Sequence, residues 1–217
     1  MKILYNVRYS GLIETPKLSQ KKKKQNLTRA LNSFYSEKDL EPITRTLILA
    51  EQKDLIKNKE IELKPRVKED LLMILERDRV LIPYKTSKTI AWEDRLLTFQ
   101  PDEKYEVPNV IRILIKIGEQ TGEFDLDHAL TCYLREIGEN DPSKILAFFH
   151  ELVMKVENGI VSAEALSHVS KKLNLDSRIG TIIAVLKGGG IISPSLRIPT
   201  ELKYEVNPFI LNSLQRV

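Results

Sequence analysis

The sequence predicts a mainly α-helical protein of the α+β class, in which two tandem units with small β-hairpins are joined by a helical linker. The first observation is a repeat, because residues 104–107 and 203–206 both read Lys-Tyr-Glu-Val. The second is that each copy follows the same series of features: an apolar helical segment, a short apolar strand that ends at a proline, and a loop. Self-similarity in a fixed order indicates a supersecondary unit that is present twice.

Length and composition agree with two folded units. The chain has 217 residues, of which 42% are hydrophobic and 29% charged, and this composition is typical of globular domains of about 100 residues each. No apolar run reaches the roughly 20 residues of a membrane span, and we see no apolar signal-peptide core at the start. A single cysteine, Cys132, excludes an internal disulfide and a cysteine-based zinc site, and we interpret it as a free thiol in a reducing compartment.

We expect four segments along the chain. Residues 1–38 should hold a strand near residues 3–13, a polar basic connector and a leading helix that begins at Leu27. Residues 39–117 should form the first unit, residues 118–142 a helical linker and residues 143–217 the second unit.

Apolar spacing and capping residues predict the elements of the two units. In the first unit we expect helices near residues 39–50, 52–59 and 65–78, strands at 80–82, 89–92 and 104–107, and an apolar helix at 110–117. After glycines in residues 118–122, the linker should contain a helix at 125–137. In the second unit we expect helices at 143–156, from Ser162, and at 176–187, and strands at 191–192 and 202–206.

Three helices, the second and third joined by a tight turn at residues 174–176, followed by a two-stranded hairpin, resemble the winged-helix version of the helix-turn-helix. The resemblance covers residues 143–214 well and residues 39–117 less well. It implies a DNA-binding protein in which the third helix enters the major groove and the hairpin, or wing, contacts the adjacent backbone or minor groove.

The third helix of the second unit has a face suited to DNA. Its inward residues at 3.6 periodicity are Ile179, Ile182, Ile183 and Leu186. The other face should present Arg178, Thr181 and Val185, of which an arginine can bind guanine through two hydrogen bonds. Ser177 and the free amides at the helix start should bind a phosphate.

The matching helix of the first unit suggests a different role. Its outward residues include Arg66, Glu69, Asp70 and Met73, and carboxylates repel phosphate. We therefore expect this helix to serve as a packing or protein-contact surface. The lysines of the predicted wing, near Trp92, still allow this unit to contact a DNA backbone.

The distribution of charge also favours a polyanion. The net charge is +6 over residues 1–40, −4 over residues 41–140 and +2 over residues 141–217. Lys21 to Lys24 form a run that we interpret either as a basic arm for DNA phosphates, as a solvated mobile segment or as a localisation signal. The DNA-contacting residues that we expect are Ser177, Arg178, Thr181, Lys171, Lys172, Lys187, Arg197, Lys21, Lys22, Lys23, Lys24, Lys85 and Lys88.

Catalytic and metal motifs are weak. His128, His150 and His168 are widely spaced, and the acids that precede His128 are explained as caps of a helix N-terminus. The three glycines at 188–190 follow a helix instead of preceding one, so they lack the geometry of a phosphate loop. We expect neither an enzyme nor a cofactor or bound metal.

Two functions remain open at this point. The first is a DNA-binding transcription regulator or replication initiator, located in the cytoplasm at the nucleoid, or in the nucleus of a eukaryote. The alternative is a non-enzymatic adaptor subunit whose units, above all the acidic middle one, bind proteins. We also expect a homodimer through the helices at 110–117 and 125–137, unless these helices pack between the two units.

Overall fold

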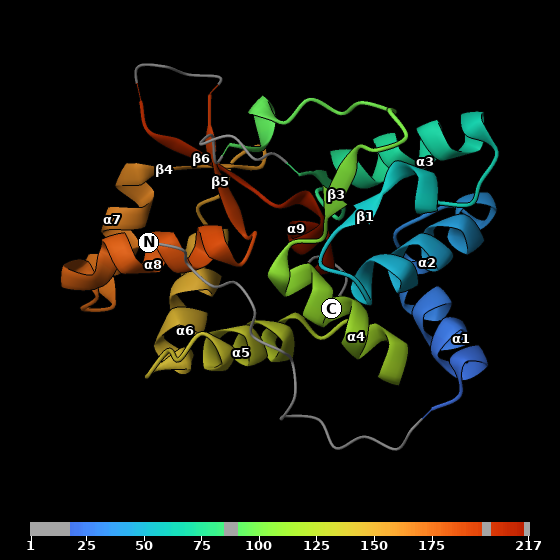
Figure 1. Ribbon diagram of the computed structural model, residues 1–217. Helices are drawn as coiled ribbons and strands as arrows, with labels where there is room; N and C mark the ends of the chain where they lie inside the picture. The colour runs from blue at the N-terminus through green and yellow to red at the C-terminus, as the bar shows by residue number, and fades with distance from the viewer. Residues whose placement is uncertain (1–17, 85–90, 197–200, 215–217) are drawn as a thin grey trace.

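The computed structural model describes residues 18–84, 91–196 and 201–214 (Figure 1). It confirms the predicted class, because the protein is mainly helical and carries two small antiparallel sheets of three strands each. In the described part of the chain, no helix has both the length and the apolar character needed to cross a membrane.

The elements follow one another in this order. The first half contains α1 (Gln20–Leu31), α2 (Glu37–Glu51), β1 (Ile56–Lys57), the 3-10 turn η1 (Asn58–Glu60), α3 (Pro65–Arg77), β2 (Ile82–Pro83), η2 (Trp92–Asp94), β3 (Lys104–Glu106) and α4 (Asn109–Thr121). The second half contains α5 (Leu126–Glu136), α6 (Pro142–Val153), β4 (Ile160–Ser162), α7 (Ala163–Lys172), η3 (Asp176–Arg178), α8 (Ile179–Gly188), β5 (Ile192–Ser195), β6 (Lys203–Val206) and α9 (Pro208–Leu214).

The structure confirms the repeat. The two sheets have the strand orders β1-β3-β2 and β4-β6-β5, so the Lys-Tyr-Glu-Val strand is central in both. Tyr105 pairs with Pro83 on the neighbouring strand, and Tyr204 pairs with Pro194 in the same way. Because both the order and the register recur, the two units share one backbone plan.

The units differ between their first strand and their third helix. The second unit has the helix α7 there, whose N-cap Ser162 accepts a hydrogen bond from the amide of Ala165 at 3.1 Å. The first unit has only the single turn η1, and the helix predicted at 52–59 is wrong. The chain there forms strand β1 instead, because Ile56 is buried beside the central strand β3.

Several other predicted boundaries need correction. The apolar helix predicted at 110–117 is longer, since α4 continues to Thr121 and ends at Gly122, whose left-handed φ of 82° suits glycine; the first residues of the linker predicted at 118–142 therefore belong to α4. The strand expected at 89–92 is also wrong at Trp92, which lies in η2, whereas residues 89 and 90 and the strand expected at 3–13 lie outside the described residues. Strands β1 and β4 were not predicted, so each expected hairpin is a three-stranded sheet.

The two units exchange backbone hydrogen bonds just after their repeated strands. The amide of Val110 donates to the carbonyl of Gly189 at 3.1 Å, and the amide of Phe209 donates to the carbonyl of Asp78 at 3.3 Å. Gly189 and Asp78 occupy matching places at the C-terminal ends of α8 and α3. The next residue in each unit, Gly190 or Arg79, has a left-handed φ of 72° or 54°. The contact between the units is therefore pseudo-twofold.

Asn207 lies at the centre of this contact and is fully buried. Its side-chain amide donates to the carbonyls of Arg79 and Gly190, both at 3.1 Å. Its side-chain oxygen accepts from the amides of Phe209 and Ile210, so it also caps α9. One side chain thus binds the turns that follow the third helices of both units.

A buried ion pair adds to the same contact. The guanidinium of Arg79 donates to the carboxylate of Glu205 at 3.2 Å and also contacts Glu76, and it lies 5.8 Å from the ring centroid of Trp92. Glu205 belongs to the second Lys-Tyr-Glu-Val strand, and its counterpart Glu106 instead pairs with Arg95 inside its own unit. The repeated glutamate therefore has a different structural role in each unit.

Helix α4 is buried on nearly all sides. It packs against α1, α2 and α5, and its apolar residues are all buried. Arg112 on the same helix donates to carbonyls at the C-terminal end of α2, among them Ala50 at 2.7 Å. The apolar residues of α4 therefore pack inside the chain, against α1 and α2 of the first half and against α5, and they give no reason to expect a dimer through this helix.

The first prediction concerns Asn207. Replacing Asn207 with Ala removes the side chain that binds the carbonyls of Arg79 and Gly190 and the amide of Ile210, and we expect the free energy of unfolding to fall by roughly 3 kcal/mol. Asn109, beside the first repeat, makes a single, more exposed bond to the carbonyl of Gly188 at 2.9 Å, so Asn109→Ala should cost less than about 1 kcal/mol. Urea denaturation of both variants measures this difference, and equal losses would contradict a central role for Asn207.

Candidate nucleic-acid interface

The second unit presents helices α7 and α8 at one end of the molecule (Figure 1). Asn174, with a left-handed φ of 56°, turns the chain after α7, and the buried Leu175 anchors the turn. Helix α8 then buries Ile182 and Leu186 against the core, as its periodicity predicts. Its opposite face is left at the surface.

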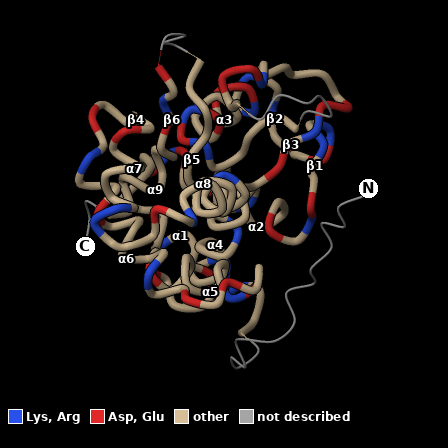
Figure 2. Tube along the Cα trace, turned by 90° about the vertical axis from the view of Figure 1, so that its left-hand side faces the viewer, with Lys and Arg blue, Asp and Glu red and all other residues tan. Residues whose placement is uncertain are grey.

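The surface of α8 is small and uncharged over most of its length. Gly180, Thr181 and Ala184 are exposed, and Ser177 is exposed just before the helix. The helix contains no carboxylate, and its trace in Figure 2 is almost entirely tan. Thr181 is thus where the sequence predicts it, but Val185 is half-buried, and its carbonyl accepts a hydrogen bond from Tyr133 at 3.1 Å.

Arg178 is not on the open face, which corrects the main prediction from the sequence. It precedes α8 as its N-cap, and its guanidinium donates to both carboxylate oxygens of Glu139, at 2.7 and 3.0 Å. The Glu139 side chain is only 6% exposed, whereas that of Arg178 is 37% exposed. A guanidinium held in this way cannot bind a guanine without first breaking the pair.

Glu139 is well suited to hold the arginine in place. Burial raises the pKa of its carboxyl, but hydrogen bonds from Arg178 and from the amides of Asp141 and Asn140 outweigh burial and hold the pKa below its usual range. The carboxylate is therefore ionised at neutral pH. The pair joins the turn between α5 and α6 to the start of α8.

The expected lysines around α8 have different environments. Lys171 is exposed, Lys187 is half-buried, and neither makes an ion pair with another described residue. Lys172 is exposed but pairs with Glu151 at 2.6 Å. Arg197 and the first-unit lysines Lys85 and Lys88 lie outside the described residues.

The lysine run is not an extended arm or connector. Lys21 to Lys24 lie in the first turns of α1, which begins seven residues before the predicted start at Leu27. Lys23 and Lys24 pair with Glu119 at 3.5 Å and Glu41 at 2.7 Å, whereas Lys21 and Lys22 are exposed. Helix α1 lies at the other end of the molecule from α7 and α8 (Figure 1), so the structure does not bring the run together with α8.

The pairing of Lys23 involves a buried acid. Glu119 on α4 is 4% exposed, and its Oε1 has no hydrogen-bond partner among the described residues. Burial raises its pKa, as does the nearby Glu51, and the ammonium groups of Lys23 and Lys116 only partly oppose this rise. Docking α1 onto α4 therefore places a carboxyl group where its ionised form is disfavoured.

The matching helix of the first unit, α3, presents charge. Arg66, Glu69, Asp70 and Met73 are all exposed, as the sequence predicts. In Figure 2 the part of the trace around α3 carries both red and blue segments, in contrast to α8. The third helices thus occupy matching positions in the two units but expose different chemistry.

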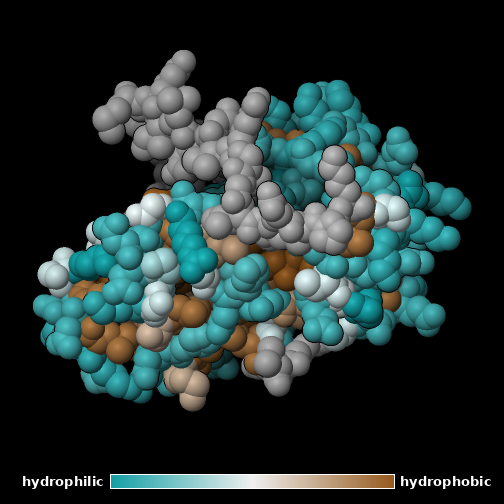
Figure 3. All heavy atoms as spheres, turned by 90° about the horizontal axis from the view of Figure 1, so that it is seen from below, coloured by the Kyte–Doolittle hydropathy of each residue, from teal (hydrophilic) through white to brown (hydrophobic). Residues whose placement is uncertain are grey.

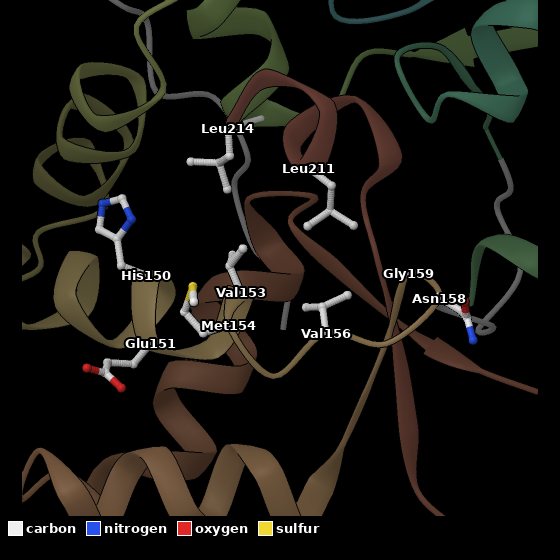
Figure 4. A pocket seen from close by; sticks show the side chains of 9 residues that line it. All are labelled: His150, Glu151, Val153, Met154, Val156, Asn158, Gly159, Leu211 and Leu214. Carbon is white, nitrogen blue, oxygen red and sulfur yellow. The ribbon is translucent and has the colours of Figure 1, made fainter. Parts of the chain in front are cut away.

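A hollow of about 670 Å³ lies between the end of α6, the turn before β4 and helix α9 (Figure 4). Leu211 and Leu214 of α9 face Val153 and Val156 across it, while His150 and Glu151 lie at one side. His150 contacts Asp127 at 3.0 Å, and the highly exposed Met154 lies at the rim. Seen from below, apolar atoms reach the surface in several separate places among polar ones (Figure 3).

No metal site is evident within the described ranges, where no three His, Cys, Asp or Glu side chains come together in a way that could hold an ion. Cys132 is buried, its Sγ lies 3.7 Å from Nε2 of His128, and burial raises the pKa of its thiol. A raised pKa disfavours the thiolate that nucleophilic chemistry requires.

Comparison with known proteins places the chain in a family. A protein family of unknown function matches residues 25–216, and the chain belongs to this family. No curated protein and no solved structure matches this chain.

The Arg178 pair yields a stability prediction. Arg178→Ala leaves the Glu139 carboxylate buried without its main partner, so we expect a loss of about 1–2 kcal/mol in the free energy of unfolding, reduced by the partial exposure of the arginine. Thermal or urea denaturation measures the loss. Glu139→Gln tests the same contact from the other side, and the absence of any loss in both variants would show that the pair is not formed in solution.

Glu119 yields a pH prediction. The pKa of Glu119 is raised in the folded protein, so between the usual carboxyl pKa and this raised value the folded state binds more protons than the unfolded state. The contribution of Glu119 to the free energy of unfolding therefore falls as the pH rises between these two values. Glu119→Gln removes the titration. The variant should therefore gain stability relative to the native chain between pH 4 and neutral pH, measured by urea denaturation across this range; a constant difference would refute the assignment.

Proposed function

We propose that the protein binds double-stranded DNA through its second unit, as a winged helix whose α8 enters the major groove. The observation that carries this proposal is the exposed face of α8, which holds Gly180, Thr181 and Ala184 and has no carboxylate; Ser177 is exposed just before the helix, next to the exposed Asp176. Small side chains allow the helix backbone to come close to a groove floor, and the lack of acids avoids repulsion by phosphates.

The order of elements supports the same proposal. In the second unit, α6, β4, α7, α8, β5 and β6 follow the order helix, strand, helix, helix, strand, strand, and β6 lies in the middle of the sheet. This order suits a helix-turn-helix followed by a wing. Lys171 in the last turn of α7 and Lys187 in the last turn of α8 supply positive charge for the DNA backbone.

The position of Arg178 changes the expected mode of recognition. With its guanidinium on Glu139, the polar groups left for base edges are the hydroxyls of Ser177 and Thr181. Hydroxyl contacts discriminate among bases less than a two-bond arginine contact does. We therefore infer that binding depends chiefly on phosphate contacts and duplex shape. The biological role that we propose is that of a transcription regulator or replication initiator.

A protein-binding adaptor is the second candidate, and a specific observation favours it. Large apolar side chains are exposed beside the wings, namely Leu96 at 74%, Leu196 at 52% and Leu202 at 59%. Glu93 joins the segment around Leu96 to the segment around Leu196, because its carboxylate accepts a hydrogen bond from the amide of Leu196 at 2.6 Å. Apolar surface at this end suits contact with another protein.

A gel mobility-shift titration separates the two candidates. We expect Thr181→Glu, which puts a carboxylate on the α8 face, to weaken duplex binding by roughly tenfold or more, because a like charge then faces the phosphates. Gln100→Glu adds the same charge at an exposed position of the first unit and should leave binding nearly unchanged. Lys171→Ala and Lys187→Ala should each reduce the slope of log affinity against log salt by about 1.

The titration also has an outcome that contradicts the proposal. If native protein at micromolar concentration and low salt shifts no duplex, DNA binding is wrong and the adaptor is favoured. If Thr181→Glu and Gln100→Glu bind equally well, the protein binds DNA but α8 is not the surface that does so.

A further inference from the structure

A single stripe of exposed residues runs along α3. Arg66, Glu69, Asp70, Met73 and Arg77 follow the i, i+3, i+4, i+7, i+11 pattern, which places them on one face of the helix. All five are exposed, and the Met73 side chain is 48% exposed. The buried residues Leu71, Leu72 and Leu75 lie on the opposite side and hold the helix on the core.

The stripe has little to bind within its own chain. Among the described residues, Arg66, Glu69 and Asp70 make no ion pair or side-chain hydrogen bond. Arg77 contacts Asp78 at 2.8 Å and still has a side-chain exposure of 71%. The stripe therefore offers an acid, an exposed thioether and a base in sequence, at positions 69, 73 and 77.

We propose that this stripe binds the same stripe of a second copy of the chain, with the two α3 helices antiparallel and Met73 at the twofold axis. Positions 69 and 77 lie four residues, or about 6 Å, on either side of Met73. In this arrangement Glu69 faces Arg77 of the second copy, and Arg77 faces Glu69 of the second copy. The two methionines pack against each other between these ion pairs.

The charge pattern selects this partner and orientation. A parallel pair would place Glu69 beside Glu69 and Arg77 beside Arg77, which is unfavourable. DNA is disfavoured by the adjacent carboxylates of Glu69 and Asp70. The antiparallel pair is self-complementary, as an isologous twofold contact requires.

The contact is small, so the association is weak. One pair of helices over this length buries less than the roughly 1,600 Å² of a standard interface. The dimer therefore forms only at high protein concentration. It does not depend on the proposed DNA binding, which resides in the second unit.

The test uses charge reversal and exchange. Analytical ultracentrifugation of native protein should show the mass rise from 25.0 kDa toward twice that value with concentration. Glu69→Arg and Arg77→Glu each place like charges at both contacts and should remain monomeric when studied alone. An equimolar mixture of the two variants restores both ion pairs and should dimerise again, as should the double variant.

Methionine provides an internal control. Met73 on α3 and Met154 beside the hollow are both exposed, and methyl NMR reports each one separately. The Met73 signal should shift with protein concentration, whereas the Met154 signal should not. Native protein that stays at 25.0 kDa, single variants that dimerise as well as the native chain, or a mixture that fails to recover would each overturn the proposal.

A concentration-dependent shift of Met154 in place of Met73 would likewise reject α3 and assign self-association to the hollow. Because mass and methyl shifts are measured without DNA, failure of this inference leaves the mobility-shift result unaffected. Conversely, loss of DNA binding in Thr181→Glu has no bearing on the mass of the native protein.

Discussion

The exchange of hydrogen bonds after the two Lys-Tyr-Glu-Val strands holds the rest of the structure in place. Val110 and Phe209 each bind a carbonyl at the end of the other unit's third helix, and the buried Asn207 binds the turns that follow both helices. These groups are inside the protein, so leaving them unpaired is costly. The two third helices are thereby fixed relative to each other, at opposite sides of one body, and α4 is enclosed between its neighbours.

This constraint explains how two similar units can have different surfaces. The backbone plan and the strand register are the same, and a left-handed residue, Arg79 or Gly190, follows two positions after the end of each third helix. Packing fixes only the inward positions of each helix. The outward positions are free to vary, so α3 exposes Glu69, Asp70 and Met73 where α8 exposes Gly180, Thr181 and Ala184.

The sequence predicts what depends on local pattern and misses what depends on distant partners. Helices α3, α5, α6 and α7 follow from apolar periodicity and caps, and the repeat correctly indicates two related units. Strands β1 and β4 have only two and three residues, too few for a periodic signal. The local pattern places Arg178 on an open face, because it carries no sign of the partner Glu139, which lies 39 residues away in the chain. The ion pairs of the lysine run in α1 were missed for the same reason.

The two proposed surfaces acquire a fixed geometry from the contact between the units. Were the units joined by a free linker, a twofold contact through α3 would leave the two α8 helices of a dimer unrelated in direction. Because Asn207 and the Arg79–Glu205 pair join the units rigidly, a dimer through α3 sets the two α8 helices at one distance and angle. Under the two proposals, a duplex would meet two copies of one surface related by a twofold axis, and the weak hydroxyl and phosphate contacts at each would add as a bivalent interaction.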